Sequence, residues 1–176
     1  MDDTPRGRRL LEAMQGDLPG LRPLEREDFP ALLGLYRSNP FFNSVSLDAP
    51  PTLENCREDA GALPPGREPC HKLFLGLFQE GRLQAALDLV EGYPQEATLY
   101  IGLLELDGAA QRQGLGTRIL DSLEAGAKEA GFGWLRLACL EKNLPGYDFW
   151  KKQGFQEEGL GVWQGGRTVL KMVRAL

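Results

Sequence analysis

The sequence predicts a mixed α/β fold, with a mostly antiparallel central sheet of about seven strands and helices on both faces. Two observations favour this fold class. Apolar runs of strand length alternate with amphipathic helical segments. One strand–helix–strand succession, with strands at residues 97–106 and 134–140 and a helix over 119–130 between them, has the order of a parallel β-α-β unit. A chain of 176 residues is large enough for one core, so we expect a single domain over residues 1–176.

The strands are predicted from runs of apolar or alternating residues. The predicted strands are 21–24, 72–78, 83–90, 97–106, 134–140, 161–163 and 168–173. Glu80-Gly81 and Gly165-Gly166 each separate two neighbouring runs as a hairpin turn, which makes those two pairs antiparallel.

Helices are predicted where apolar residues recur at helical spacing or where good helix formers cluster. The predicted helices are 8–14, 29–36, 52–60, 119–130 and 145–152. Thr52 is a suitable N-cap for the third of them. Residues 1–20 are expected to form an arm or helix outside the core. Residues 41–51 are expected to form a loop, in which Phe41 and Phe42 plug the core rather than line a substrate pocket.

The most informative stretch is Gln111-Arg112-Gln113-Gly114-Leu115-Gly116-Thr117, which joins an apolar run to an amphipathic helix. Its two glycines allow positive φ and leave no Cβ in the way of a ligand. The unpaired N–H groups and the dipole of the following helix favour an anion, with phosphate or pyrophosphate as the natural guest. Arg112 and Thr117 add a charged donor and a hydroxyl.

The spacing of this stretch leaves a ligand-free turn open as an alternative. The stretch lacks the third glycine of a dinucleotide-binding motif and the Gly-Lys-Ser/Thr ending of a P-loop.

Gln111-x-x-Gly114-x-Gly116 resembles the Q/R-x-x-G-x-G/A signature of the GNAT superfamily of N-acetyltransferases, in which this loop holds the pyrophosphate of acetyl-CoA. Leu104-Glu105-Leu106 resembles the signature's strand, and Asn143 through Phe155 resembles the family's N…FYxxxGF segment. Leu21-Arg22-Pro23-Leu24 followed by Glu27-Asp28 resembles its opening. The resemblance runs from about residue 21 to the C-terminus, and it implies a sheet splayed between the fourth and fifth strands.

The resemblance also implies a set of cofactor contacts, because in that family pantetheine lies between the splayed strands and the loop binds the pyrophosphate. The implied contacts are Leu104, Leu106, Gln111, Arg112, Gln113, Gly114, Leu115, Gly116, Thr117, Asn143, Phe149, Trp150 and Lys152. The side chains of Leu104 and Leu106 could equally belong to the core. An N–H group exposed by the splayed strands would stabilise the oxyanion that forms at the thioester carbonyl.

The reaction that this family performs is direct attack of a neutral amine on the thioester. An alkyl ammonium group titrates near a pKa of about 10.4, so a base must take its proton. Asp88, Glu91 and Glu105 are the candidates. Asp88 interrupts an apolar strand, and either a structural partner or a role in a site would explain it. Glu105 faces away from Leu104 and Leu106 on strand parity, which favours a surface or structural charge unless the strand bulges there.

Three further residues are candidates on the acceptor side. Tyr100 stands where some family members carry a glutamate base, and a phenol could relay a proton through water. Glu91 and Tyr93 lie in a loop rich in groups that bind polar ligands, and with Glu105 they are our candidate substrate contacts.

Trp150 departs from the family pattern, because many relatives carry at this position the tyrosine that protonates the leaving thiolate. An indole N–H donates a hydrogen bond but does not give up its proton. Either the thiolate leaves unprotonated, or water or Tyr147, three residues earlier on the same helix, serves instead. The candidate catalytic residues are therefore Asp88, Tyr100 and Tyr147.

Composition excludes several classes of protein. The formal net charge of −5 argues against nucleic acid as a partner. The three cysteines are scattered and His71 is the only histidine, so no metal site is expected. The unpatterned cysteines, and the lack of an apolar leader or membrane span, favour a cytoplasmic protein.

The leading hypothesis is an N-acetyltransferase that transfers the acetyl group of acetyl-CoA to a primary amine of a small molecule or peptide, through a tetrahedral intermediate. The alternatives are an acyl-CoA-binding module without efficient turnover and a phosphate-binding domain for another nucleotide. The family resemblance also allows a homodimer.

Overall fold

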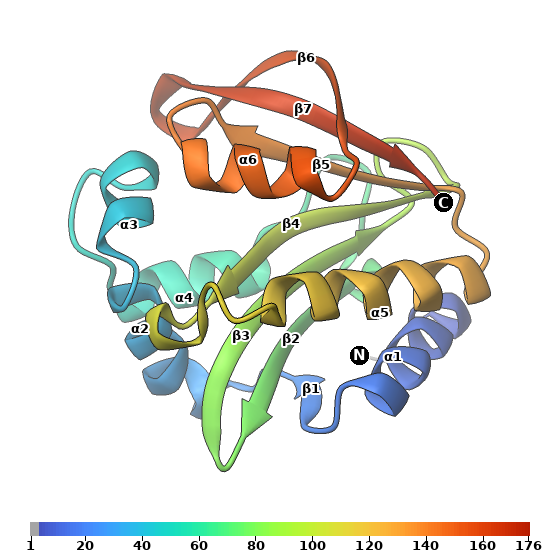
Figure 1. Ribbon diagram of the computed structural model, residues 1–176, viewed down its shortest axis with the longest axis horizontal. Coiled ribbons are helices and arrows are strands. Elements are labelled where there is room, and N and C mark those ends of the chain that lie inside the picture. Colours follow the sequence, from blue (N-terminus) through green and yellow to red (C-terminus); the bar gives the residue numbers. More distant parts are fainter. Residues whose placement is uncertain (1–3) are drawn as a thin grey trace.

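The structure is a computed structural model that describes residues 4–176 (Figure 1). Its centre is a seven-stranded sheet in the order β1-β2-β3-β4-β5-β7-β6. The strands are β1 (Leu21–Pro23), β2 (Lys72–Gln79), β3 (Arg82–Glu91), β4 (Thr98–Leu106), β5 (Trp134–Leu140), β6 (Gln156–Trp163) and β7 (Arg167–Ala175). All neighbouring pairs are antiparallel except β4 and β5. The predicted mixed, mostly antiparallel sheet is therefore confirmed.

The sheet opens between β4 and β5. These two strands pair in parallel only over Thr98–Ile101 and Trp134–Leu137, and both continue beyond that register without pairing to each other. The carboxyl-terminal halves of the two strands therefore diverge, as Figure 1 shows between β4 and the group of β5 and α6. The predicted splay between the fourth and fifth strands is confirmed.

Strand β4 contains a bulge at Gly102. Asp88 of β3 pairs with Leu103 while Leu89 pairs with Ile101, so Gly102 has no partner residue on β3. One extra residue reverses the alternation of side chains beyond it. Leu104 therefore faces the same side of the sheet as Ile101, and both pack on the main core.

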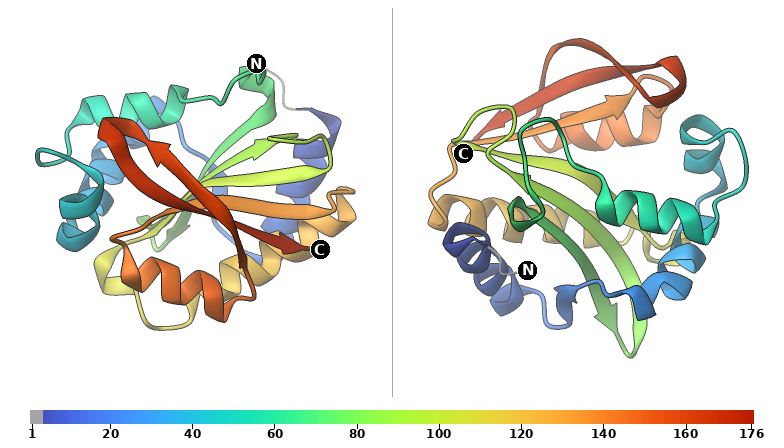
Figure 2. Two further views of the ribbon diagram at one scale, coloured as in Figure 1. Left: turned by 90° about the horizontal axis from the view of Figure 1, so that it is seen from above. Right: turned by 180° about the vertical axis from the view of Figure 1, so that it is seen from behind.

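Six α-helices cover the two faces of the sheet in the described part of the chain. They are α1 (Pro5–Asp17), α2 (Phe29–Arg37), α3 (Pro40–Ser46), α4 (Leu53–Gly61), α5 (Leu115–Glu129) and α6 (Leu144–Lys152). Short 3-10 turns lie at Arg26–Asp28, Pro69–His71, Gly108–Ala110 and Gln164–Gly166. Helices α1, α5 and α6 pack on one face, and α2 and α4 pack on the other, where the view from behind shows α4 in front of the strands (Figure 2).

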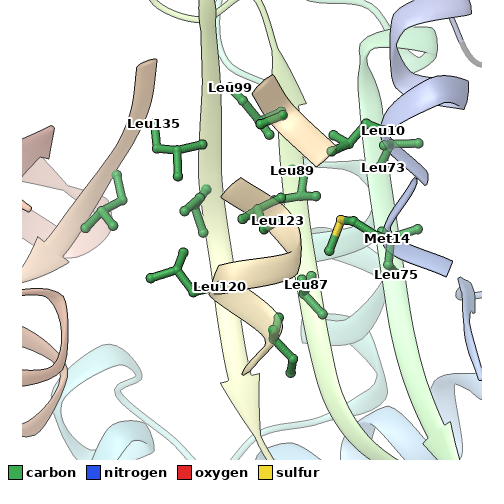
Figure 3. Close-up of a cluster of buried hydrophobic side chains, with 14 of the residues drawn as sticks. Leu10, Met14, Leu73, Leu75, Leu87, Leu89, Leu99, Leu120, Leu123 and Leu135 are labelled. Carbon is green, nitrogen blue, oxygen red and sulfur yellow. The ribbon is translucent and has the colours of Figure 1, made fainter. Parts of the chain in front are cut away.

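The larger core lies between the sheet and α1 and α5. Leucines of β2, β3, β4 and β5 meet Leu120 and Leu123 of α5 there (Figure 3). Leu10 and Met14 of α1 are fully buried in the same cluster, and Leu18 is 1% exposed. The expectation that residues 1–20 lie outside the core is therefore wrong for this part of the chain, because α1 presents an apolar face that docks on α5 and the sheet.

Residues 40–46 form helix α3 and not the predicted loop. Pro40 occupies the first turn of the helix, where its missing N–H costs no hydrogen bond. Phe41 remains 50% exposed, so the prediction that this side chain plugs the core is also wrong. Within residues 4–176, no helix is both long enough and apolar enough to cross a membrane.

Candidate active site

The loop before α5 has the geometry of an anion site. Arg112 and Gly114 adopt positive φ values of 59° and 81°. Gly114 is the N-cap of α5, and no described side chain caps the helix. A Cβ built on Gly114 would meet no described atom within 4 Å, so the space in front of the helix is open. The first-turn N–H groups therefore point at room that an anion can fill.

Two glutamines hold this cofactor loop, residues 111–117, in place. Gln113 Nε2 donates to the carbonyl oxygen of Ala109 at 2.7 Å. Gln111 Nε2 donates to Asn39 Oδ1 and, at 3.2 Å, to the carbonyl oxygen of Leu106. These bonds tie the start of the loop to the end of β4 and to the α2–α3 junction.

The start of α5 packs closely on α6. A Cβ on Gly116 would lie 3.3 Å from the ring of Phe149, and Thr117 Oγ1 accepts a hydrogen bond from Gln153 at 2.9 Å. Gly116 thus permits contact between the helices, whereas Gly114 leaves space for a ligand. Leu115 packs on the edge of the main core.

The three other predicted cofactor residues of α6 differ in their exposure. Asn143 accepts a hydrogen bond from the N–H of Gly146 and caps α6. Trp150 is 9% exposed and packs edge-on against Phe149 and Phe155, so it is a core residue. Lys152 is exposed at the end of the helix.

Leu104 and Leu106 lie on the part of β4 that extends beyond its pairing with β5. Their side chains pack against the main core, so only their main-chain groups are directed along the splay. Main-chain groups on an unpaired strand edge are the donors and acceptors that an extended ligand can use.

The opposite face of the sheet, which we call the acceptor face, carries Asp88. Its Oδ2 lies 2.9 Å from Lys72 Nζ, and both side chains are largely buried. A Cβ on Gly102 would lie 2.6 Å from this oxygen, so the carboxylate sits against the bulge of β4. Burial raises the pKa of Asp88, although the ammonium of Lys72 acts to lower it. Asp88 Oδ1 is buried and has no hydrogen-bond partner among the described residues.

Tyr93 and Tyr100 form an aromatic pair on the acceptor face. Their ring centroids lie 5.2 Å apart in an edge-to-face arrangement. Burial raises the pKa of Tyr100 to about 12, with smaller contributions from Tyr93 and Asp88. The phenol of Tyr100 therefore stays protonated at neutral pH.

Glu105 also lies on the acceptor face and is 8% exposed. The prediction that it faces away from Leu104 and Leu106 is confirmed, but it is not a surface charge. Its Oε1 accepts a hydrogen bond from Asn39 Nδ2 at 2.8 Å. Burial raises the pKa of Glu105 to about 8, although the bond from Asn39 acts to lower it.

Glu91 is not at the acceptor face, and the prediction that it contacts substrate is wrong. It lies at the end of β3, is 4% exposed, and accepts hydrogen bonds from Thr4 Oγ1 at 2.7 and 2.9 Å. Gly7 packs directly against the carboxylate. Strand parity directs Glu91 toward α1, where it anchors the start of that helix.

Tyr147 does not join Asp88 and Tyr100. It lies on α6, on the other face of the sheet, where its ring packs against the main core. Its hydroxyl donates to Glu157 Oε1 at 2.5 Å, which raises the pKa of the phenol. The three candidate catalytic residues therefore do not form one constellation.

A cavity of about 440 Å³ lies where α3, the end of β5 and the β6–β7 turn meet. Val45, Asp48, Leu140, Glu141 and Arg167 are among its lining residues. Arg167 Nη2 lies 2.6 Å from Asp48 Oδ1, and its Nε donates to the carbonyl oxygen of Val45 at 3.2 Å. The end of β5, one of the two splayed strands, thus contributes to the lining of the cavity, and an arginine joins its two walls.

Sequence reasoning missed Asn39, Lys72 and the β6–β7 turn as parts of this site. The Asn39-Pro40 dipeptide is a turn signal that could have drawn attention to Asn39. Nothing in the local sequence indicates that Lys72 meets Asp88 or that Arg167 reaches α3. Among the described residues, no group of three or more His, Cys, Asp or Glu side chains is arranged to hold a metal ion.

Comparison with known proteins adds the family. A family model described as the acetyltransferase (GNAT) family matches residues 24–155, which is most of the chain. The chain belongs to this family. The GNAT chain is accordingly an acyltransferase, and the predicted superfamily is confirmed. No curated relative matches the chain.

Solved structures of GNAT enzymes share the fold. An acetyltransferase from Thermus thermophilus aligns with a TM-score of 0.71 at 25% identity, over 89% of this chain and 96% of the other. The PaiA N-acetyltransferase from Thermoplasma acidophilum, in complex with coenzyme A, gives 0.63 at 19% identity, over 89% and 98%. The ribosomal-protein-S18-alanine N-acetyltransferase from Escherichia coli gives 0.63 at 18% identity, over 88% and 92%.

Proposed function

We propose that this GNAT protein transfers the acetyl group of acetyl-CoA to a primary amine of a small molecule or peptide. The observation that carries the proposal is the uncapped start of α5 behind the open Gly114, placed at the end of a strand whose edge is left unpaired by the splay. A diphosphate fits the first feature and an extended pantetheine arm fits the second.

Acetyl-CoA supplies the acyl group as an activated thioester. The residues of the chain bind and orient it. The N–H groups at the start of α5 hold the diphosphate, and the main chain of Leu104 and Leu106 lies along the arm. The side chains of Leu104 and Leu106 stay in the core. Positioning of the two reactants accounts for most of the acceleration that such a site can provide.

The acceptor face supplies the base. Asp88 lies against the bulge that begins the unpaired part of β4, and its raised pKa brings it closer to the working pH of a general base. Tyr100 lies on the same face, on the neighbouring strand β4, and relays the proton when the amine does not reach the carboxylate. Lys72 holds Asp88 in place through the 2.9 Å contact.

The leaving thiolate requires no side-chain acid. Trp150 has no proton to give and is packed in the core, and the hydroxyl of Tyr147 is already donated to Glu157. Thiols titrate near a pKa of about 8.5, so a thiolate is a tolerable leaving group near neutral pH.

The acceptor enters through the cavity between α3 and the β6–β7 turn. Two acidic residues, Asp48 and Glu141, and two basic residues, Lys142 and Arg167, line it, so the overall charge of −5 is what favours a cationic amine. Two of the fold relatives are named as acting on the alanine of ribosomal protein S18 and on the N-terminal serine of ribosomal protein L7/L12, which supports a peptide amine as one candidate.

The test combines calorimetry with acetyl-CoA and an assay of thiol release over a panel of amines. Gly114→Val fills the open space and removes the positive-φ residue, so its affinity for acetyl-CoA should fall by more than about tenfold. Gly66→Val is the matched control, because Gly66 also has positive φ and open surroundings but lies away from the loop. Equal affinity in the two glycine variants would refute the proposal.

Asp88→Asn should bind acetyl-CoA normally and lose turnover by about a hundredfold or more.

A second candidate function is an acyl-CoA-binding module without efficient turnover. The observation in its favour is Trp150, which replaces the tyrosine of many relatives, while the hydroxyl of Tyr147 is engaged by Glu157. Tight binding of acetyl-CoA with no thiol release from any amine in the panel would favour this candidate over the first.

A further inference from the structure

Asn39 is a buried side chain at the α2–α3 junction whose amide is hydrogen-bonded on both ends. Its Nδ2 donates to Glu105 Oε1 at 2.8 Å. The same nitrogen lies 2.9 Å from the carbonyl oxygen of Leu106 and 3.2 Å from that of Leu35. Its Oδ1 accepts a hydrogen bond from Gln111 Nε2. One side chain therefore contacts the start of the cofactor loop and a carboxyl of the acceptor face.

The hydrogen bonds that link the side chains of Gln111, Asn39 and Glu105 run in one direction and form a hydrogen-bonded chain. Gln111 donates to Asn39, and Asn39 donates to Glu105. An ionised Glu105 is a stronger acceptor than a neutral one, and it polarises the amide so that the next bond in the chain is strengthened as well. Ionisation of Glu105 therefore favours the arrangement in which Gln111 anchors the loop.

We propose that Asn39 is a positioning residue that couples the cofactor loop to Glu105, so that binding of acetyl-CoA and loss of the Glu105 proton favour each other. The inference rests on the proposed function, since it takes acetyl-CoA as the ligand of the loop. Coupling of this kind is reciprocal: the coenzyme favours the ionised carboxyl as much as the ionised carboxyl favours the coenzyme.

The surroundings of Glu105 set the pH range in which this coupling acts. Burial raises the pKa of Glu105 to about 8, the bond from Asn39 lowers it, and the carboxyl of Asp59 on α4 raises it. Tyr36 of α2 also faces this region; burial raises its pKa, with contributions from Asp59 and then Glu105. Glu105 therefore gains and loses its proton to solvent in neutral to mildly alkaline solution.

Direct electrostatics would act in the opposite sense. The negative charge of a bound diphosphate disfavours a second negative charge nearby, so repulsion alone would make Glu105 take up a proton on binding. The hydrogen-bonded chain instead makes it release one. The sign of the proton exchange therefore distinguishes coupling through Asn39 from simple repulsion.

The experiment is calorimetric titration with acetyl-CoA between pH 7 and 9, in buffers of different ionisation enthalpy. Acetyl-CoA is the probe because the thiol of free coenzyme A would itself titrate near about 8.5. We expect proton release on binding. The affinity for acetyl-CoA should rise about threefold from pH 7 to pH 9, because ionisation of Glu105 strengthens the bond from Gln111 to Asn39 only modestly.

Three variants assign the effect. Asn39→Ala should abolish the proton release. Glu105→Gln keeps the amide chain but cannot ionise, so it should bind acetyl-CoA with an affinity that does not change with pH. Ser38→Ala is the matched control: it removes the bond that Ser38 Oγ accepts from the N–H of Gly108 at 2.8 Å, next to the same loop, and should keep the proton release.

Proton uptake by the wild type, or release that persists undiminished in Glu105→Gln, would overturn the proposal even if Asn39→Ala fails to fold. Failure of the wild type to bind acetyl-CoA would be a different result, because it would contradict the proposed function itself. The other titrating groups are the same in every variant, so the differences between variants are the quantity that decides.

Discussion

Glu105 is the residue at which burial and charge conflict most clearly. It is 8% exposed, and its only hydrogen-bonded side-chain partner among the described residues is the neutral amide of Asn39. A carboxyl in such a place keeps its proton well above the usual range, with a pKa of about 8 against about 4.3 for a free glutamate. This difference makes stability depend on pH.

Glu105→Gln should therefore be more stable relative to the wild type at pH 9 than at pH 5. The raised pKa means that the folded wild type binds more protons than the unfolded chain between about pH 4.3 and 8, so its stability falls as pH rises through that range. The glutamine variant does not lose this stability. In the wild type, the loss in the free energy of unfolding between pH 5 and pH 9 amounts to roughly 3 to 4 kcal/mol. Urea unfolding of both proteins at the two pH values measures it. An equal difference at both would show that Glu105 ionises normally.

A variant of Tyr147 tests the proposal that no side chain protonates the leaving thiolate. Its hydroxyl donates to Glu157, and it lies across the sheet from Asp88. Tyr147→Phe should change kcat by less than about threefold, because loss of a true general acid costs about a hundredfold or more. Steady-state kinetics with the best amine of the panel give the answer. A loss as large as that of a general acid would place the phenol at the leaving group.

At the level of helices, α1 is bound to the body of the protein by apolar burial. Leu10 and Met14 are fully buried, and Gly126 of α5 allows the close approach, since a Cβ there would lie 3.1 Å from Leu10. Arg6 adds contacts to the carbonyl oxygens of Ala130 and Gly131 at the end of α5. The helix is therefore part of the larger core.

Met14→Ala should lower the free energy of unfolding by about 2 to 5 kcal/mol, as expected for truncation of a fully buried side chain. Glu12→Ala, on the exposed side of the same helix, is the control and should change stability by less than about 0.5 kcal/mol. Denaturant unfolding measures both. A small effect of Met14→Ala would mean that α1 detaches readily.

Local signals predicted most elements correctly. Gly, Pro and cap residues marked the ends of β2, α4 and α6 to within a residue or two, because these signals act within one turn of chain. They did not predict that α1 docks on the core, because an amphipathic face does not specify its partner. Helix α3 was missed because a seven-residue helix carries little periodic signal.

The site was predictable where it depends on the main chain. The open Gly114 and the uncapped helix follow from a local pattern, and so does the position of Leu104 on its strand. The partners of the side chains were not predictable: Glu91 meets Thr4 across 87 positions, and Gln111 meets Asn39 across 72. Contacts between such distant residues are decided by the fold and leave no trace in a single sequence.

The whole molecule consists of two sheet segments joined by the short β4–β5 pairing. A further connection is Arg167, which bridges the β6–β7 turn and the end of α3. Asp48 is 92% exposed, so the pair contributes little to stability, but it sets the separation of the two cavity walls.

Arg167→Met should raise the KM for the acceptor by roughly two- to fivefold, in keeping with the strength of an exposed ion pair. The KM for acetyl-CoA should stay within about twofold, because the coenzyme contacts lie elsewhere. Arg57→Met breaks the exposed pair with Glu54 on α4 and is the control. Steady-state kinetics with both substrates varied provide the measurement. An effect on acetyl-CoA alone would place the arginine in the coenzyme site.

Gly102 is one extra residue in β4, and it shifts the alternation of the side chains that follow it by one position. Everything after it is displayed with inside and outside exchanged, so Glu105 comes to the acceptor side and Leu104 and Leu106 return to the interior. If β4 kept Gly102 but lost the bulge, so that the glycine took a regular place in the strand, the carboxyl would turn inward and the leucines outward. A residue without a side chain thus determines which chemistry the end of the strand presents.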